Sequence, residues 1–308
     1  MTKRERVQKC LDREEHDRVP GSFWHHFPEG KWFSDAAVKA HLDFYRAANL
    51  DFMKIMEEIR CSFDITSPND WTHYIPPRRD APEKKAQLEI IKRISDEIGD
   101  ECMVFTTVFD PLRTVGIVMG YELIEAHIRE NRAAVSTAFM AMAESISEYA
   151  ADCISAGADG IFFSSKGAEK GRFNAEDFEG AVLSPDSFIC KAIYERSKYT
   201  LLHICGYDTE LAFYRNFPAA AVNWDCHHGG YDLKSGAELF GDRVILGGMQ
   251  NRDGVLVDGT DEEIEAAITR IAADRAFVNR FILGADCTLP EEVNYSRVRV
   301  AMERLARL

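Results

Sequence analysis

The sequence predicts an α/β protein with a (β/α)8 TIM-barrel fold that occupies the whole chain, residues 1–308, as a single domain. Three observations lead to this prediction. Eight short apolar segments alternate with eight amphipathic segments, which is the pattern of repeated strand–helix units in a parallel sheet. The apolar segments lack a regular polar face, as expected of strands that are covered on both sides. No G-x-G-x-x-G motif follows the first apolar segment, so the main signal of a dinucleotide-binding open sheet is missing.

Each expected strand is a run rich in apolar, β-branched and aromatic residues. The expected strands are Val19–His25, Leu50–Met56, Cys102–Asp110, Gly160–Ser164, Tyr199–Cys205, Ala219–Cys226, Val244–Met249 and Phe281–Cys287. The strands of such a barrel all end on one face, so reactive side chains are expected where these runs end.

Each expected helix is an amphipathic segment between two of these strands or after the last one. The expected helices are Asp35–Ala48, Glu83–Ile98, Ala133–Ala156, Pro185–Ser197, Thr209–Asn216, Asp232–Phe240, Asp261–Ala273 and Tyr295–Arg307. Two of them have start signals: Ser184 precedes Pro185 as an N-cap would, and Thr260 forms a capping box with Glu263. A further helix, at Thr2–Arg13, is expected as an N-terminal extension that plugs the bottom of the barrel.

Composition and charge exclude several classes of protein. The formal net charge of −14 argues against non-specific nucleic-acid binding, which needs a basic surface. The sequence has no apolar run of membrane-spanning length and no signal-peptide core at its N-terminus, so we expect a cytoplasmic protein without a membrane partner. The eight cysteines stand singly, without a C-x-x-C pair, which is typical of thiols in a reducing compartment rather than of a disulfide framework.

The fifth expected strand carries the strongest chemical signal, the pair His203 and Cys205. Residues two apart on a strand point to the same face, and imidazole and thiolate are ligands that zinc prefers. Cys287 ends the last expected strand, where the curvature of a barrel would bring it to the same height near the axis. Three protein ligands leave a fourth position open, as in catalytic zinc sites. We therefore predict a zinc site at His203, Cys205 and Cys287, whose catalytic contribution comes through the metal.

Two alternatives to this ligand set stay open on spacing alone. His203 could be a hydrogen-bonded core histidine, with both cysteines serving only as packing residues. Cys226 could replace Cys287 as the third ligand, although strand parity from Asp225 suggests that only one of these two neighbours faces inward.

Other polar or aromatic residues at strand ends are candidates for contacting a substrate or the ligands of the metal. The substrate-binding candidates are Trp24, Glu57, Asp225 and Gln250. The alternative for the three polar ones is that each caps a helix or pairs with a nearby charge. Lys166 and Arg113 are candidates for holding an anionic substrate, although charged loop residues are commonly just solvated.

Several segments of the sequence resemble the uroporphyrinogen decarboxylase superfamily, and the likeness covers essentially the whole chain. They are KRERVQKCLDREEHDRVP, DFMKIMEE, LHICG, VNWD, LGGMQN and GADC. Within the superfamily the chain looks like the zinc-dependent methyltransferase branch, which acts with corrinoid proteins. That branch carries His-x-Cys and a distant cysteine, matched here by His203, Cys205 and Cys287. The decarboxylase branch carries an arginine-bearing motif after the first strand, whereas this chain reads SFWHHFPEG and has no arginine there.

The resemblance implies an enzyme that moves a methyl group between a small substrate and a corrinoid protein. The expected cofactors are Zn²⁺ and a cobalamin carried by the partner protein. The substrate would be a thiol, or a methyl ether or amine-type donor, and the ligand set does not choose the direction of transfer. Two other function classes stay open: a metal-free decarboxylase or lyase, and a module that only docks a corrinoid protein.

The expected docking surface of the corrinoid protein is the mouth of the barrel, because a corrinoid is too large to enter a barrel filled by side chains. Two long connections, Glu57–Pro82 and Pro111–Arg132, are expected to form loops there. Their apolar residues are predicted to be an exposed docking patch, with simple cover of the mouth as the alternative. These residues are Trp71, Tyr74, Ile75, Ile117 and Met119.

Overall fold

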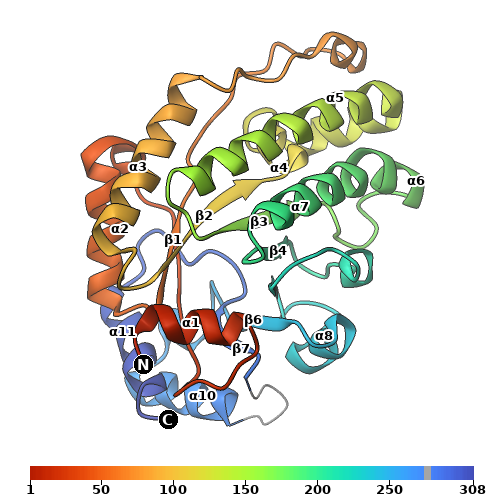
Figure 1. Ribbon diagram of the computed structural model, residues 1–308. Helices are drawn as coiled ribbons and strands as arrows, with labels where there is room; N and C mark the ends of the chain where they lie inside the picture. The colour runs from red at the N-terminus through yellow and green to blue at the C-terminus, as the bar shows by residue number, and fades with distance from the viewer. Residues whose placement is uncertain (274–278) are drawn as a thin grey trace.

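The computed structural model describes residues 1–273 and 279–308 and shows a curved parallel sheet with helices around its outer side (Figure 1). Over these residues the sheet has seven strands, and each strand pairs in parallel with the next one along the chain. The strands are β1 (Phe52–Ile55), β2 (Met103–Phe109), β3 (Gly160–Lys166), β4 (Leu201–Cys205), β5 (Ala221–Trp224), β6 (Val244–Met249) and β7 (Phe281–Ala285). This strand order is that of a TIM-barrel-like fold, so the predicted α/β class is confirmed at that level.

The prediction of an eighth strand at Val19–His25 is wrong. The segment makes only isolated parallel bridges, Gly21 with Leu283 and His25 with Leu289. It still lies between the two edge strands, because Ser22 N–H donates to Leu283 O and Asp51 N–H donates to Gly21 O, each at 2.9 Å. A regular ladder fails because Pro20 has no N–H and the Gly21 N–H donates to the Asp51 carboxylate instead.

Helices cover the outer side of the sheet and one of its ends. They are α1 (Lys3–Leu11), α2 (Ser34–Ala48), α3 (Pro82–Ile98), α4 (Pro111–Met119), α5 (Tyr121–Ser155), α6 (Ala175–Phe178), α7 (Ser184–Arg196), α8 (Leu233–Phe240), α9 (Val255–Asp258), α10 (Asp261–Ala272) and α11 (Tyr295–Leu305). Short turns of other helix types are η1 (Glu29–Lys31), η2 (Pro68–His73), η3 (Glu179–Leu183) and η4 (Leu211–Tyr214). None of the helices in the described part of the chain has the length and apolarity to cross a membrane.

Helix α1 lies at the end of the sheet where the strands begin. Thr2 caps it in a capping box with Glu5, and its apolar face, including Val7 and Leu11, joins the side chains that fill the inside of the curved sheet. The Arg4 guanidinium pairs with Asp159 just before β3. Helix α1 closes the end of the sheet where the strands begin. A functional site is therefore expected at the opposite end, where the strands finish.

Three expectations about the helices are corrected by the structure. The connection Pro111–Arg132 is not a loop: it forms α4 and the first part of α5, which continues through a non-helical residue, Asn131. The segment Thr209–Asn216 forms only the short turn η4. Ser184 is not an N-cap, because it already has helical dihedral angles, while the capping box at Thr260 is confirmed.

Candidate metal centre

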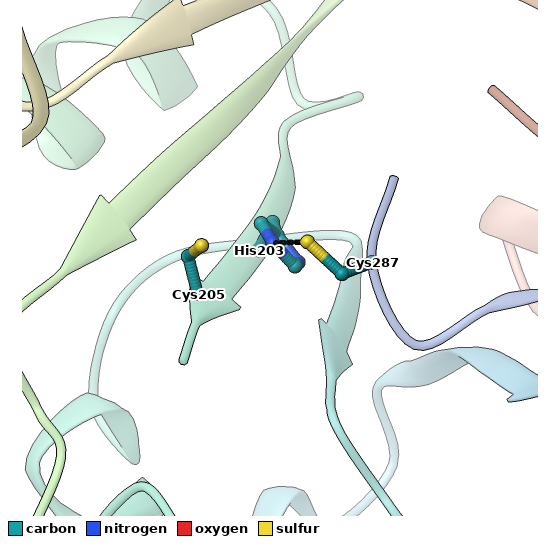
Figure 2. Close-up of side chains that lie close together, drawn as sticks. All are labelled: His203, Cys205 and Cys287. Carbon is teal, nitrogen blue, oxygen red and sulfur yellow. Dashed lines mark hydrogen bonds between the residues drawn. The ribbon is translucent and has the colours of Figure 1, made fainter. Parts of the chain in front are cut away.

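The fold brings His203, Cys205 and Cys287 together at the ends of β4 and β7 (Figure 2). One nitrogen and two sulfur atoms from these side chains lie within 4.8 Å of one another. His203 Nε2 and Cys287 Sγ lie 3.4 Å apart. His203 and Cys205 share a face because they are two residues apart on β4, and the curvature of the sheet turns the end of β7 toward them.

The backbone turns sharply directly after this pair of residues. Gly206 has a φ of +135°, in the region that favours glycine. A Cβ atom at this position would lie 2.8 Å from carbon atoms of the Glu169 side chain. A glycine is therefore needed for the chain to leave the strand at once and keep the cysteine at the rim of the sheet.

Asn223 fixes the orientation of the His203 ring. The two residues are register partners on β4 and β5, and Asn223 Oδ1 lies 2.6 Å from His203 Nδ1. The Asn223 amide nitrogen donates to Leu246 O at 2.8 Å and to Ala285 O at 3.1 Å, so its oxygen is the atom that faces the ring. That oxygen accepts from Nδ1–H, which leaves the lone pair of Nε2 directed at the two sulfur atoms.

The two thiols share one proton in the absence of a metal. A hydrogen bond from the Cys205 thiol lowers the pKa of Cys287 to about 6. The same bond, together with burial, raises the pKa of Cys205 to about 12. At neutral pH the pair therefore consists of one thiolate and one thiol, and a bound metal would have to displace the second proton.

A cavity of about 510 Å³ opens in front of these three side chains. Its wall near the ends of β2 and β3 carries the cations Arg113 and Lys166, and its wall near the ends of β5 and β7 carries the carboxylates of Asp225 and Asp286. Glu169 also lines the first wall and pairs with Lys166 at 2.5 Å, so the positive charge there is partly compensated.

The structure separates the other predicted substrate contacts. Asp225 lines the cavity, where Oδ1 accepts from the backbone N–H groups of His227 and His228, at 2.9 and 2.8 Å. Trp24, Glu57 and Gln250 are not among the described residues that line it.

Each of these three residues lies in another part of the fold. Trp24 lies inside the sheet, where its ring packs edge-on against Phe162 at 5.0 Å. Glu57 lines a separate small cavity against α5, and Gln250 lines one beside α8 and α10. Their role as substrate contacts stays a prediction.

Cys226, the alternative third ligand, belongs to a different group of side chains. Its thiol donates to Asp286 Oδ1 at 3.1 Å, and Asp286 Oδ2 lies 2.6 Å from His227 Nδ1. Burial raises the pKa of Cys226, so this sulfur stays a thiol. The geometry therefore favours Cys287 as the partner of His203 and Cys205.

A family model of uroporphyrinogen decarboxylase (URO-D) matches residues 35–308. The chain belongs to this family. Among curated proteins, the search found no match for this URO-D-family protein.

Solved structures show the same fold. A methyltransferase from Methanosarcina mazei superposes with a TM-score of 0.77 at 16% identity. The match covers 100% of this chain and 99% of the methyltransferase chain. A B12-independent methionine synthase from Shewanella sp. W3-18-1, in complex with selenomethionine, gives a TM-score of 0.62 at 14% identity, covering 94% of this chain and 97% of its own. At these identities the likeness establishes the fold.

Proposed function

We propose that this URO-D-family protein is a zinc-dependent methyltransferase, with residues 1–308 acting as one catalytic domain. It would move a methyl group between a small substrate, a thiol or a methyl ether or amine-type donor, and a corrinoid protein. The observation that carries the proposal is the convergence of His203, Cys205 and Cys287 in front of an open cavity. The family membership and the methyltransferase fold support it, and the corrinoid partner rests on the sequence resemblance alone.

The residues present fit a zinc ion. One imidazole nitrogen and two sulfur atoms form a ligand set that zinc favours, and a set of three protein ligands would be typical of a catalytic zinc site. His203 is held with Nε2 facing the sulfur atoms, as a ligand must be. When bound there, zinc would act as a Lewis acid that keeps a substrate thiol deprotonated or polarises the oxygen of a methyl ether.

The protein's own residues would prepare and shape the site. The hydrogen bond from the Cys205 thiol favours the thiolate form of Cys287, and Cys205 would give up its proton on metal binding. Burial lowers the pKa of Lys54 on β1 to about 7, and the charge of Cys287 acts in the opposite direction. Its Nζ lies 4.3 Å from the centre of the Phe162 ring. Arg113 and Lys166 on one wall of the cavity, and Asp225 on the other, would orient a polar substrate.

The test is methyl transfer with a reconstituted corrinoid protein, before and after chelation. We expect transfer by the zinc-loaded protein, its loss on chelation, and its recovery when zinc is restored. Cys287→Ser should lose activity, while Cys226→Ser, a matched change just outside the ligand set, should keep it. Decarboxylase or lyase activity that survives chelation would instead identify a metal-free enzyme. A zinc-loaded protein that binds the corrinoid partner without transfer in either direction would identify a docking module.

A further inference from the structure

His26 forms a histidine–carboxylate pair at the mouth of the curved sheet, outside the proposed ligand set. Its Nδ1 lies 2.5 Å from Glu58 Oε1, and Glu58 is almost fully buried. The other oxygen of this carboxylate, Oε2, accepts from Arg60 Nη2 at 3.1 Å. A carboxylate that pairs with a guanidinium is an acceptor, so Nδ1 carries the hydrogen of its bond to Glu58. The neutral ring is therefore held with its lone pair on Nε2.

The backbone places His26 beside the segment that carries Cys287. The preceding residue, His25, forms a parallel bridge with Leu289, two residues after that cysteine. His26 lines the same cavity as Cys287 and His203. Within residues 1–273 and 279–308, no hydrogen bond is made to Nε2 of His26. This cavity therefore contains an imidazole with one nitrogen anchored to a carboxylate and the other free to meet a substrate.

The carboxylates on the walls of this cavity are less suited than His26 to take up a proton near neutral pH. Asp225, Asp286 and Glu169 already bind other hydrogen-bond donors, and Glu291 is exposed. An imidazole ordinarily titrates at about pH 6.5, whereas a carboxylate ordinarily titrates at about pH 4. A proton acceptor works best when it titrates near the working pH, which favours the histidine. The other titratable side chains that line the cavity outside the ligand set are Arg113, Lys166, Arg252 and Tyr207.

We propose that His26 is a catalytic residue that exchanges a proton with the reacting heteroatom of the substrate, and that Glu58 positions it. This inference rests on the proposed methyl transfer and adds the group that handles the proton. With a thiol substrate, the S–H bond breaks, its electron pair stays on sulfur and the proton goes to Nε2. The buried Glu58 carboxylate would stabilise the imidazolium that forms.

With a methyl ether or amine-type donor, the same nitrogen acts in the opposite sense. The C–O or C–N bond breaks, and its electron pair stays on the oxygen or nitrogen. The methyl group passes to the reduced corrinoid, which supplies the electron pair of the new bond. The proton moves from Nε2 of His26 to the oxygen or nitrogen, so that a neutral alcohol or amine leaves.

The test counts the protons released when 2-mercaptoethanol binds to the zinc-loaded protein at about pH 7.5, where an ordinary imidazole is mostly neutral. Isothermal titration calorimetry in PIPES, HEPES and Tris gives this number, because the measured heat varies with the ionisation enthalpy of the buffer. Few protons should reach the buffer if His26 takes up the thiol proton. His26→Asn should release about one proton more per bound thiol than the wild type. Asparagine can still donate to Glu58 from the position of Nδ1 but has no basic nitrogen.

His228→Asn is the matched control. His228 also pairs its Nδ1 with a carboxylate, Asp225 Oδ2 at 3.1 Å, but it is not among the described residues that line the cavity. This variant should release as many protons as the wild type. The inference is overturned if the wild type and His26→Asn release equal numbers of protons, if His228→Asn changes the number as much, or if the thiol does not bind. Failure of the proposed function would appear elsewhere, as missing zinc or missing methyl transfer.

Discussion

At the residue scale, one amide decides which nitrogen of His203 faces the two cysteines. Asn223 is almost fully buried and uses both of its donors on backbone carbonyls, so its oxygen must accept from His203 Nδ1. Such partners of metal-binding histidines orient the ring and hold its tautomer. Asn223 is therefore a positioning residue of the candidate zinc site.

Replacing Asn223 should weaken zinc binding without removing any ligand. We expect Asn223→Ala to lower zinc affinity by about 10- to 100-fold, measured by competition with a chelator of known affinity. Gln87→Ala is the control, because it also removes a buried amide that donates to a backbone carbonyl, Met56 O at 3.0 Å. Equal zinc affinity in both variants would show that Asn223 does not hold the histidine.

Glu57 should make the stability of the protein depend on pH. Burial raises its pKa from an ordinary value of 4.5 to about 8, and its Oε2 has no hydrogen-bond partner among residues 1–273 and 279–308. Between about pH 5 and 8 the unfolded chain ionises this group while the folded protein keeps it protonated, so the unfolded state binds fewer protons. The free energy of unfolding should therefore fall as pH rises through this window.

Glu57→Gln tests this dependence because glutamine imitates the protonated acid. We expect the variant to gain thermal stability over the wild type at pH 8 and little at pH 5, measured as the midpoint of thermal unfolding. Glu89→Gln, at an exposed position of α3, should follow the wild type at both values. Parallel pH profiles for the wild type and Glu57→Gln would contradict the assignment.

At the element scale, the sequence patterns predicted strands better than their ends. The alternation on β4 correctly placed His203 and Cys205 on one face, because strand parity is a local property. Glu57 was harder to place, since β1 ends at Ile55 and parity has no meaning once the chain leaves the sheet. The role of Asn223 depends on the register between β4 and β5, a non-local property that no pattern within one strand reveals.

The segment between β1 and α3 packs on α5, and its three expected docking residues differ in exposure: Ile75 is 83% exposed, Tyr74 is half-buried and Trp71 is buried. Trp71, in η2, is 1% exposed, and its Nε1 donates to His127 Nδ1 at 3.1 Å. None of the described residues that line the metal-centre cavity comes from 57–82. Trp71 was thus wrongly predicted to be a docking residue. The sequence of a long connection does not indicate whether an aromatic side chain within it is exposed or buried.

Trp71→Ala should therefore act on stability, and Tyr207→Ala on the partner. We expect Trp71→Ala to lower the free energy of unfolding by about 3–5 kcal/mol, measured by chemical denaturation. Tyr207 lines the cavity just after β4 and is 53% exposed, so its loss should weaken binding of the corrinoid protein at unchanged stability and zinc content. Unchanged partner affinity in Tyr207→Ala would place the docking surface elsewhere.

At the scale of the whole molecule, the curvature of the sheet builds the candidate site. Cys287 is more than eighty residues from Cys205 along the chain, and only the curling of β4 to β7 brings the two sulfur atoms together. The barrel class was predictable because alternating strands and helices leave few arrangements. The absence of a regular strand at Val19–His25 was not predictable, because the Gly21 N–H donates to the side chain of Asp51, which belongs to another segment.

The most direct test of the account is X-ray absorption spectroscopy of the zinc-loaded protein, combined with its metal content. The account predicts one zinc per chain, with two sulfur neighbours at about 2.3 Å and one nitrogen at about 2.0–2.1 Å. Cys205→Ser and Cys287→Ser should each lose most of the zinc, whereas Cys226→Ser should retain it. A zinc surrounded only by nitrogen and oxygen, or full zinc retention in both of the first two variants, would contradict the proposed centre.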